Sequence, residues 1–276
     1  MSASSPIRLP TKFIEKLWGA KDLAPWYPLN KNNIGEVWFE ADLPILVKFL
    51  FTSDRLSIQV HPADSFAAQH ENTCGKTEMW YVLRADPGAQ LGIGLREPLT
   101  RERLRDAAET GEIEHLLRWI EVGAGDVFFI PAGTVHAIGS GLALCEIQQH
   151  SDITYRMYDY GRPRELHLDK AIQVAVLTPS DPKPLLLPVD CEYFHVELDR
   201  TASPLQYKPE PGRFHLLIFL SGSGTLGGQA FREGETWLIP AGADPFMIQP
   251  IDPVKFLRAW VPRFDGLTDT QFIDSL

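Results

Sequence analysis

The chain has 276 residues, of which 44% are hydrophobic, and a formal net charge of -10. That length accommodates one large domain or two small ones with a buried core. The acidic balance, with no local cluster of lysine and arginine, argues against binding to nucleic acid or to an anionic membrane. No apolar run approaches the roughly 18 residues that span a bilayer. The expected partner is therefore a small molecule.

The start of the chain and its cysteines predict a cytoplasmic protein. Residues 1–6 lack the basic segment followed by an apolar one that marks a secretion signal. The cysteines are Cys74, Cys145 and Cys191, an odd number without CxxC spacing. Reduced thiols fit this pattern better than a disulfide framework or a structural zinc site.

Short apolar runs separated by Gly, Pro, Asp and Asn make up most of the chain and predict a mainly β fold. In segment 56–62, alternation separates two strand faces: Leu56, Ile58 and Val60 on one, and Ser57, Gln59 and His61 on the other. In segment 76–83, the same alternation groups Lys76, Glu78, Trp80 and Val82. Each strand therefore presents potential metal ligands on a single face.

Two short helices are predicted between about residues 100 and 118, inserted into the sheets. Apolar residues recur there at helical spacing on both sides of Gly111: Leu104, Ala107 and Ala108 before it, and Ile113, Leu116 and Leu117 after it. A strand from Asp126 to Ile130 follows and runs into a Pro-Ala-Gly turn. That turn can aim His136 back between the sheets.

Two further strands carry charged residues. Over 144–148, one face holds Leu144, Glu146 and Gln148, and the other holds Cys145 and Ile147. Over 154–158, Arg156 alternates with Tyr155 and Met157 and shares its face with Thr154 and Tyr158. We predict that Glu146 is buried and that Arg156 points into a pocket.

An internal repeat divides the chain. Residues 125–136 read GDVFFIPAGTVH and residues 234–245 read GETWLIPAGADP, so both contain G-x5-P-x-G. In each copy a strand enters a tight turn, whose glycine allows a backbone geometry that a β-carbon would obstruct. The Pro-rich stretch 178–188 is the predicted linker, since it can continue neither a helix nor a central strand. We therefore predict two related β-sandwich units, about 1–180 and 189–276.

Four side chains of the first unit have the chemistry of a metal site. Borderline divalent ions take imidazole nitrogen and carboxylate oxygen, and a catalytic site keeps one position open. We predict that Gln59, His61, Glu78 and His136 bind one ion per chain, Zn²⁺ being favoured although iron or manganese would accept the same groups. Taken singly, each has an ordinary structural interpretation; the ordered set favours a site. The second unit has Pro245 in place of His136 and has lost at least that ligand.

The same motifs resemble a known family. G-x5-P-x-G-x2-H resembles the second motif of the cupin superfamily, and QVHP, GKTE and PAGTVH resemble type I phosphomannose isomerases of the short bacterial form. Further similar segments span about residues 10–260: Trp18-Gly19, 35–38, Val47-Lys48 and EIQQHSDITYRMYDYGR at 146–162. The resemblance implies two cupin-like β-sandwich or barrel (jelly-roll) units, the second one degenerate. It also implies metal binding by the four residues named above and an active-site role for Arg156.

The family interconverts mannose 6-phosphate and fructose 6-phosphate by moving a proton between C1 and C2 through an enediol. The chain is thus expected to be an aldose–ketose isomerase, a monomer or homodimer, whose metal polarises the O1/O2 region of the sugar. Lys48, Lys76 and Arg156 would supply the positive charge that a sugar phosphate needs, and Arg156 could grip the phosphate or stabilise the enediolate. For the base, Lys76, Lys48 and Glu146 stay open, and Glu146 could instead orient a metal ligand.

Two other functions compete with isomerisation. The first is an iron-dependent cupin dioxygenase, which would use two imidazoles and one carboxylate. A fourth ligand at Gln59 and cations at Lys76 and Arg156 fit an anionic sugar better than oxygen chemistry. The second is a non-catalytic, sugar-binding cupin module, such as the second unit suggests, although the first unit keeps every element of the motif.

Overall fold

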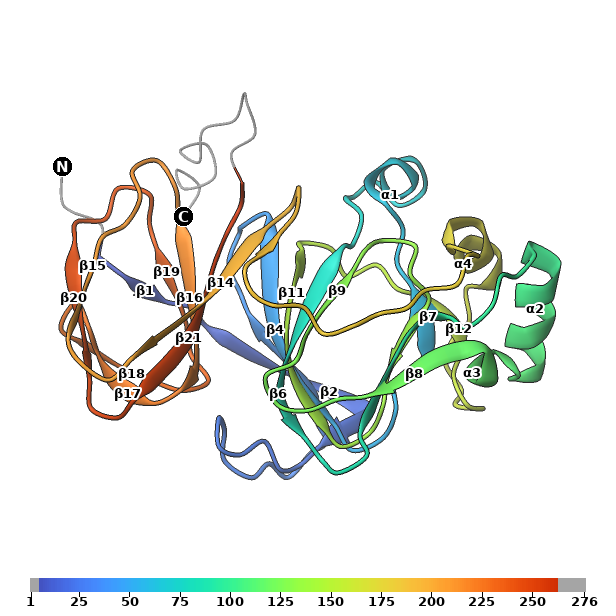
Figure 1. The fold of residues 1–276 in the computed structure, drawn as a ribbon, viewed down its shortest axis with the longest axis horizontal. Helices are drawn as coiled ribbons and strands as arrows, with labels where there is room; N and C mark the ends of the chain where they lie inside the picture. Colours follow the sequence, from blue (N-terminus) through green and yellow to red (C-terminus); the bar gives the residue numbers. More distant parts are fainter. Residues whose placement is uncertain (1–4, 263–276) are drawn as a thin grey trace.

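Residues 5–262 are described by a computed structural model, in which four antiparallel sheets form two sandwiches placed side by side (Figure 1). The predicted mainly β fold with cupin-like sandwiches is confirmed. None of the four sheets closes into a barrel within this described range. The outermost ends of the predicted units, residues 1–4 and 263–276, lie outside the described residues.

The N-terminal sandwich has an inner and an outer sheet. In sheet order, the inner sheet consists of β2 (Thr11–Ala20), β3 (Ile34–Phe39), β4 (Ile45–Thr52), β11 (Leu142–Gln149), β6 (Glu78–Ala85) and β9 (Val127–Ile130). The outer sheet consists of β12 (Tyr155–Tyr158), β5 (Ile58–Val60), β10 (His136–Ile138), β7 (Gln90–Leu95) and β8 (Leu117–Glu121). All of the sequence-predicted site residues lie on or beside these two sheets.

The C-terminal sandwich repeats this layout. Its inner sheet consists of β1 (Ile7–Arg8), β19 (Thr236–Ile239), β16 (His215–Ser221), β21 (Val254–Trp260), β14 (His195–Thr201) and β13 (Val189–Asp190). Its outer sheet consists of β15 (Leu205–Tyr207), β20 (Phe246–Pro250), β17 (Ser223–Leu226) and β18 (Gln229–Arg232). Strand β1 comes from the start of the chain and pairs with β19. The division into units 1–180 and 189–276 stays a prediction. Strand β1 belongs to the first unit by sequence but to the C-terminal sheet by pairing.

The largest apolar core lies between the two inner sheets. Phe49 and Phe51 of β4 and Leu216 and Ile218 of β16 belong to it. Strand β4 is buried along its whole length because its opposite face closes the N-terminal sandwich. Every second residue of β4 therefore packs in the core between the two inner sheets. The residues between them point into the N-terminal sandwich.

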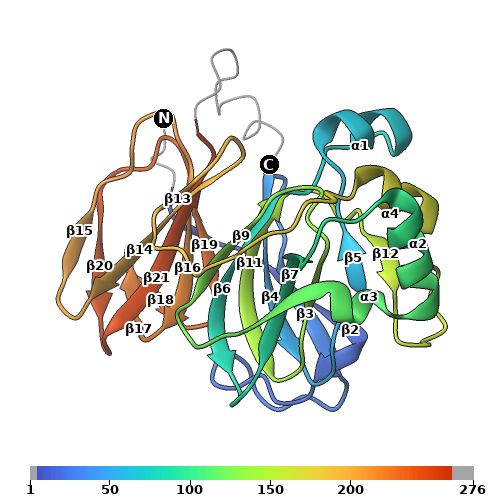
Figure 2. The ribbon, with the colours of Figure 1, turned by 45° about the vertical axis from the view of Figure 1, so that its right-hand side comes forward.

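Four short helices occur in the described range: α1 (Asp64–His70), α2 (Arg101–Thr110), α3 (Ile113–Leu116) and α4 (Leu168–Val174). Helices α2, α3 and α4 lie beside the outer N-terminal sheet (Figures 1 and 2). The two predicted helices are α2 and α3, separated by Gly111 in the left-handed conformation, whereas Leu117 already begins β8. Helices α1 and α4, each of seven residues, are too short for a periodic signal and were not predicted. No helix of residues 5–262 is long and apolar enough to cross a membrane.

The two turns of the repeat differ in their need for glycine. Gly133 has φ +86°, and a β-carbon there would lie 2.9 Å from Cγ2 of Val176. Gly242 lies outside the left-handed region and a β-carbon there would meet nothing within 4 Å. The prediction for the turn is confirmed for Gly133 and wrong for Gly242, because Val174 and Val176 crowd only the first of these two positions.

Candidate metal centre

The predicted metal ligands meet between the two sheets of the N-terminal sandwich. Gln59 lies in β5 and His61 follows this strand directly, while Glu78 and His136 begin β6 and β10. His136 pairs with Gln59 across the antiparallel β10 and β5. Alternation along β5 holds from Ile58 onwards. The prediction that Leu56 shares the face of Ile58 and Val60 is wrong, because Leu56 precedes the strand and packs into the sandwich interior.

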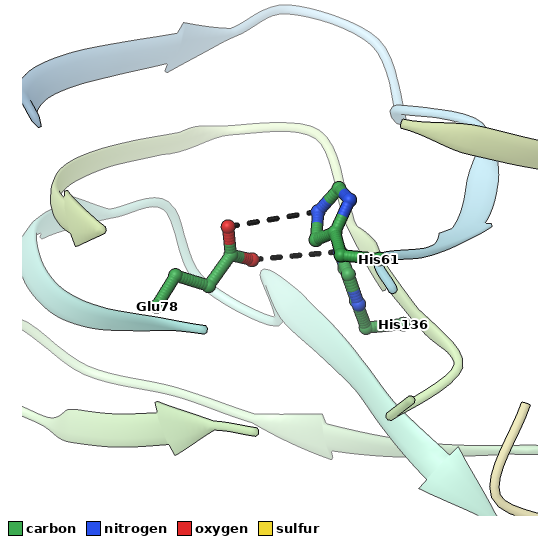
Figure 3. Close-up of side chains that lie close together, drawn as sticks. All are labelled: His61, Glu78 and His136. Atoms are coloured by element: carbon green, nitrogen blue, oxygen red, sulfur yellow. Dashed lines mark ion pairs between the residues drawn. The ribbon is translucent and has the colours of Figure 1, made fainter. Parts of the chain in front are cut away.

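Two imidazoles face one carboxylate in this centre (Figure 3). Nε2 of His61 lies 3.6 Å from one oxygen of Glu78, and Nε2 of His136 lies 3.5 Å from the other. One ligand atom from each of the three residues can be chosen so that all lie within 4.8 Å of one another. This spacing leaves room for one ion among them and matches the predicted His, Glu and His set.

The hydrogen bonding of the centre fits a site for a cation. Both oxygens of Glu78 and Nε2 of His61 are buried and have no hydrogen-bond partner in the described part of the chain. One Glu78 oxygen has an ion pair with Lys76 at 3.3 Å. Leaving such atoms buried without hydrogen bonds is unfavourable, and an ion would provide a partner for all of them. Nδ1 of His136 donates to the carbonyl of Thr134 at 2.9 Å, which leaves the lone pair of Nε2 turned toward Glu78.

Gln59 lies beside these ligands with its amide nitrogen toward them. That nitrogen is 3.3 Å from Nε2 of His136, and the amide oxygen accepts the Ser57 hydroxyl at 3.2 Å. Oxygen and nitrogen of an amide exchange places by a half-turn of the group. Such a turn would present the oxygen to the position that the other ligands surround.

The two histidines are neutral in this environment. Burial, followed by the positive charge of Lys76, lowers the pKa of His61 well below its usual value. Burial is also the main cause that lowers the pKa of His136 to about 4. Neutral imidazole is the form that binds a metal, so both rings are ready to act as ligands at neutral pH.

A group of buried charges adjoins the ligands on the inner sheet. Nζ of Lys76 lies 3.3 Å from Glu78 and 3.9 Å from Glu146, and Nζ of Lys48 also lies 3.9 Å from Glu146. Glu146 accepts a hydrogen bond from the Trp80 indole at 3.0 Å. Burial raises the pKa of Glu146, and the neighbouring carboxylate of Glu78 raises it further. For Lys76, burial lowers the pKa but the two carboxylates raise it above its usual value, so this lysine stays protonated.

Arg156 borders the same space from the outer sheet. It pairs with Gln59 across β12 and β5, and its side chain lines the pocket as predicted, whereas Tyr155 and Met157 are buried on the other face. Tyr158 also packs on that other face, so the prediction that it shares the face of Arg156 is wrong. The reason is a β-bulge between Arg156 and Tyr158, which interrupts the alternation.

A pocket of about 210 Å³ is lined by Gln59, Lys76 and Glu146 and by further charged residues that the sequence did not predict. These are Lys16, Glu36, Asp152 and Arg164. Lys16 pairs with Glu36 at 3.1 Å, and Lys48 pairs with Asp152 at 3.3 Å. Alternation would have put Lys16 beside Trp18 and Glu36 beside Trp38, but nothing in the sequence tells which face of β2 and β3 is the inner one. Hollows of about 440 and 640 Å³ lie elsewhere and contain none of the predicted ligands.

Comparison with known proteins shows the family of the chain. No family model matches the chain. A curated relative, mannose-6-phosphate isomerase ManA of Bacillus subtilis, is 34% identical over 89% of this chain and 96% of its own length. The chain belongs to the mannose-6-phosphate isomerase family. A mannose-6-phosphate isomerase of Streptococcus mutans is 46% identical over 49% of this chain and 44% of its own length.

Solved structures of the same family share the fold. The crystal structure of mannose 6-phosphate isomerase from Bacillus subtilis matches with a TM-score of 0.83 and 27% identity, over 93% of this chain and 99% of that one. A mutant phosphomannose isomerase from Salmonella typhimurium matches with a TM-score of 0.74 and 16% identity, over 94% and 100% of the two chains. The second comparison speaks for the fold alone.

Proposed function

We propose that the chain interconverts mannose 6-phosphate and fructose 6-phosphate, using one zinc ion held by Gln59, His61, Glu78 and His136. The observation that carries this proposal is the convergence of two neutral imidazoles on a buried carboxylate whose oxygens have no hydrogen-bond partner among residues 5–262. Membership of the isomerase family supports the same reaction. Neither a dioxygenase nor a non-catalytic sugar-binding module is favoured by these relatives.

Zinc suits the donor set because it accepts imidazole nitrogen together with carboxylate oxygen. When bound, it would act as a Lewis acid on the sugar oxygens at C1 and C2. Imidazole Nε2 atoms of His61 and His136 and the carboxylate of Glu78 would hold it, with the amide oxygen of Gln59 after its half-turn. Residues that line the pocket would make the other contacts to the substrate.

Glu146 is the proposed base that moves the proton between C1 and C2. Burial raises its pKa, which makes the carboxylate a stronger base than an exposed one. Trp80 fixes one carboxylate oxygen, and the other faces Lys48 and Lys76. Lys76 stays protonated and is therefore assigned as a cation near the developing enediolate.

Arg156 is the proposed contact to the anionic substrate. Its Nε is buried and has no hydrogen-bond partner in the described range, while one terminal nitrogen donates to the carbonyl of Glu165. One end of the guanidinium is thus anchored, and the rest is free to bind phosphate or enediolate oxygens. Lys48 lies deeper and pairs with Asp152 at the rim, so it would add positive potential.

The proposal extends to the surroundings of the enzyme. We place it in the cytoplasm as a monomer or homodimer, with a soluble sugar phosphate as its substrate. Free thiols at Cys74, Cys145 and Cys191 suit a reducing compartment.

A coupled assay for fructose 6-phosphate formed from mannose 6-phosphate tests the proposal directly. Purified protein is measured as prepared, after treatment with chelator, and after addition of zinc. We expect activity to disappear with chelator and to return with zinc at about one ion per chain. Absence of activity at every metal loading would contradict the function, and full activity in metal-free protein would contradict the role of the metal.

A further inference from the structure

Asp64, the first residue of α1, binds three separate segments of the chain. Its Oδ1 accepts the backbone N–H of Gly75 at 2.7 Å and the side-chain amide of Gln149 at 2.8 Å. Its Oδ2 accepts the hydroxyl of Tyr193 at 2.9 Å. No lysine, arginine or histidine of the described range forms an ion pair with it, so its protein partners in this range are N–H and O–H groups.

Each of the three segments leads to the metal centre or to the other sandwich. Gly75 immediately precedes the Lys76-Thr77-Glu78 segment. Gln149 ends β11, the strand of Glu146, and its side-chain oxygen accepts the N–H of Thr77 at 2.8 Å. Tyr193 belongs to the turn between β13 and β14 of the C-terminal sandwich. Asp64 itself stands three residues after His61.

The backbones of these segments are in direct contact. A β-carbon on Gly75 would lie 2.6 Å from the backbone nitrogen of Asp64, closer than any side chain tolerates. The N–H of Lys76 donates to the carbonyl of Pro62 at 3.0 Å. The segment after His61 and the segment before Glu78 are thus in backbone contact next to the two ligands. Asp64 lies at this contact, which we call the junction.

Charge on Asp64 strengthens this junction. Burial raises its pKa, but hydrogen bonds from Gly75, Gln149 and Tyr193 outweigh burial and lower it. The carboxylate is therefore ionised at neutral pH, and bonds to an ionised acceptor are about twice as strong as neutral ones.

We propose that Asp64 is a positioning residue of the metal centre: it sets the spacing between His61 and Glu78, and Tyr193 makes the C-terminal sandwich part of that framework. This inference rests on the proposed function for the identity of the ion. It assigns the C-terminal sandwich, which has Pro245 in place of His136, a role in catalysis without contact to substrate.

Two pairs of variants test the proposal. Asp64→Ala removes all three bonds, whereas Asp64→Asn keeps an oxygen for Gly75 and Gln149 and is the conservative rescue. Tyr193→Phe removes only the bond to the C-terminal sandwich. Its matched control is Tyr207→Phe, which also loses a hydroxyl that is bonded, to His215, but at a place remote from the ligands.

The first measurement needs no metal. Hydrogen exchange of the Gly75 and Thr77 amides in metal-free protein should accelerate at least about tenfold in Asp64→Ala, less in Asp64→Asn and Tyr193→Phe, and not in Tyr207→Phe. Because this measurement uses metal-free protein, it tests the role of Asp64 independently of zinc. Failure of the wild-type protein to bind zinc would contradict the proposed function but not this role. Unchanged exchange in Asp64→Ala overturns the inference; if that variant fails to fold, unchanged exchange in both Asp64→Asn and Tyr193→Phe does so.

The second measurement follows the ion. Loss of a group that orients metal ligands typically lowers metal affinity by about 10- to 100-fold. We expect zinc to leave Asp64→Ala faster by that factor, with a changed visible spectrum of the Co²⁺-substituted protein and a fall in kcat at nearly constant KM. Asp64→Asn should recover most of this loss. A Co²⁺ spectrum and a zinc release rate equal to wild type in Asp64→Ala would show that the junction is merely structural.

Discussion

The two copies of G-x5-P-x-G occupy the same place in their sandwiches but end in different chemistry. In the first, the strand opposite the motif begins with Glu78, which pairs with Ile130. In the second, the equivalent strand begins with His215, which pairs with Ile239. Both residues are buried, yet only Glu78 has two imidazoles beside it. The backbone frame alone therefore does not make a metal centre.

The neighbouring charges are reversed between the copies. Two residues further along, β11 places Glu146 next to Lys48 of β4, whereas β21 places Arg258 next to Glu197 of β14. Arg258 and Glu197 form an ion pair, and Arg258 also lies 3.5 Å from Asp199. A carboxylate faces the ligands in the first sandwich and a guanidinium takes its place in the second. Function thus resides in the side chains that a shared frame carries.

Replacing one buried histidine in each copy should give the largest difference in activity and zinc content between the two sandwiches. His136→Ala is expected to lower kcat/KM by at least about a thousandfold and to reduce zinc content, since a Lewis-acid metal contributes several kcal/mol. His215→Ala should lose only about 1–3 kcal/mol of unfolding free energy through its bond to Tyr207 and keep its zinc. Zinc analysis and steady-state kinetics measure both. Normal activity in His136→Ala would refute the ligand assignment.

The reversed charges offer the next test. Glu146→Gln should lower kcat by about 100-fold or more, the usual contribution of a general base, while zinc stays bound. Glu197 occupies the position in the second sandwich that Lys48 occupies in the first. Glu197→Gln should leave kcat within about twofold of the wild-type value. Equal losses in the two variants would mean that Glu146 acts through stability and not through proton transfer.

Acid should destabilise the metal-free chain through both copies. Burial lowers the pKa of His136 and of His215 from 6.5 to about 4. An unfolded chain takes up these protons near pH 6.5 and the folded chain only near pH 4, so the free energy of unfolding falls as the pH drops through this window, by up to about 3 kcal/mol per imidazole. Urea unfolding at pH 7 and pH 5 measures it. His215→Phe should show a weaker pH dependence than the parent chain, and an identical one would disprove this contribution.

Alanine at the turn glycines should give the smallest difference. Gly133→Ala forces a β-carbon into a left-handed residue that already contacts the Val174 carbonyl and Val176, and should cost about 1–2 kcal/mol. Gly242→Ala has open space and should be neutral or stabilising by up to about 1 kcal/mol. Urea unfolding of both variants, compared with wild type, is the measurement. Equal destabilisation would contradict the difference between the turns.

Much of the candidate site was predictable because strand alternation has a fixed period of two. Trp80 and Val82 face the interior of the sandwich and Met79 and Tyr81 the core between the inner sheets, as the 76–83 pattern requires. Alternation failed where the backbone is irregular: Leu56 precedes its strand, and the bulge after Arg156 turns Tyr158 away. Irregularities of this kind depend on contacts with distant segments, which local spacing does not encode.

The sequence by itself determined the β class, the two insertion helices, the repeat and the ordered motif of Gln59, His61, Glu78 and His136, because periodicity, turn chemistry and ligand type are local properties. Tertiary structure alone decided which charges share the pocket and how the ligand strands are held together. Lys16 and Glu36 enter the site because β2 and β3 join the inner sheet, and Asp64 meets Gln149 and Tyr193 over 85 and 129 positions of chain. Contacts at such separations follow from how the sheets stack, which no single segment specifies.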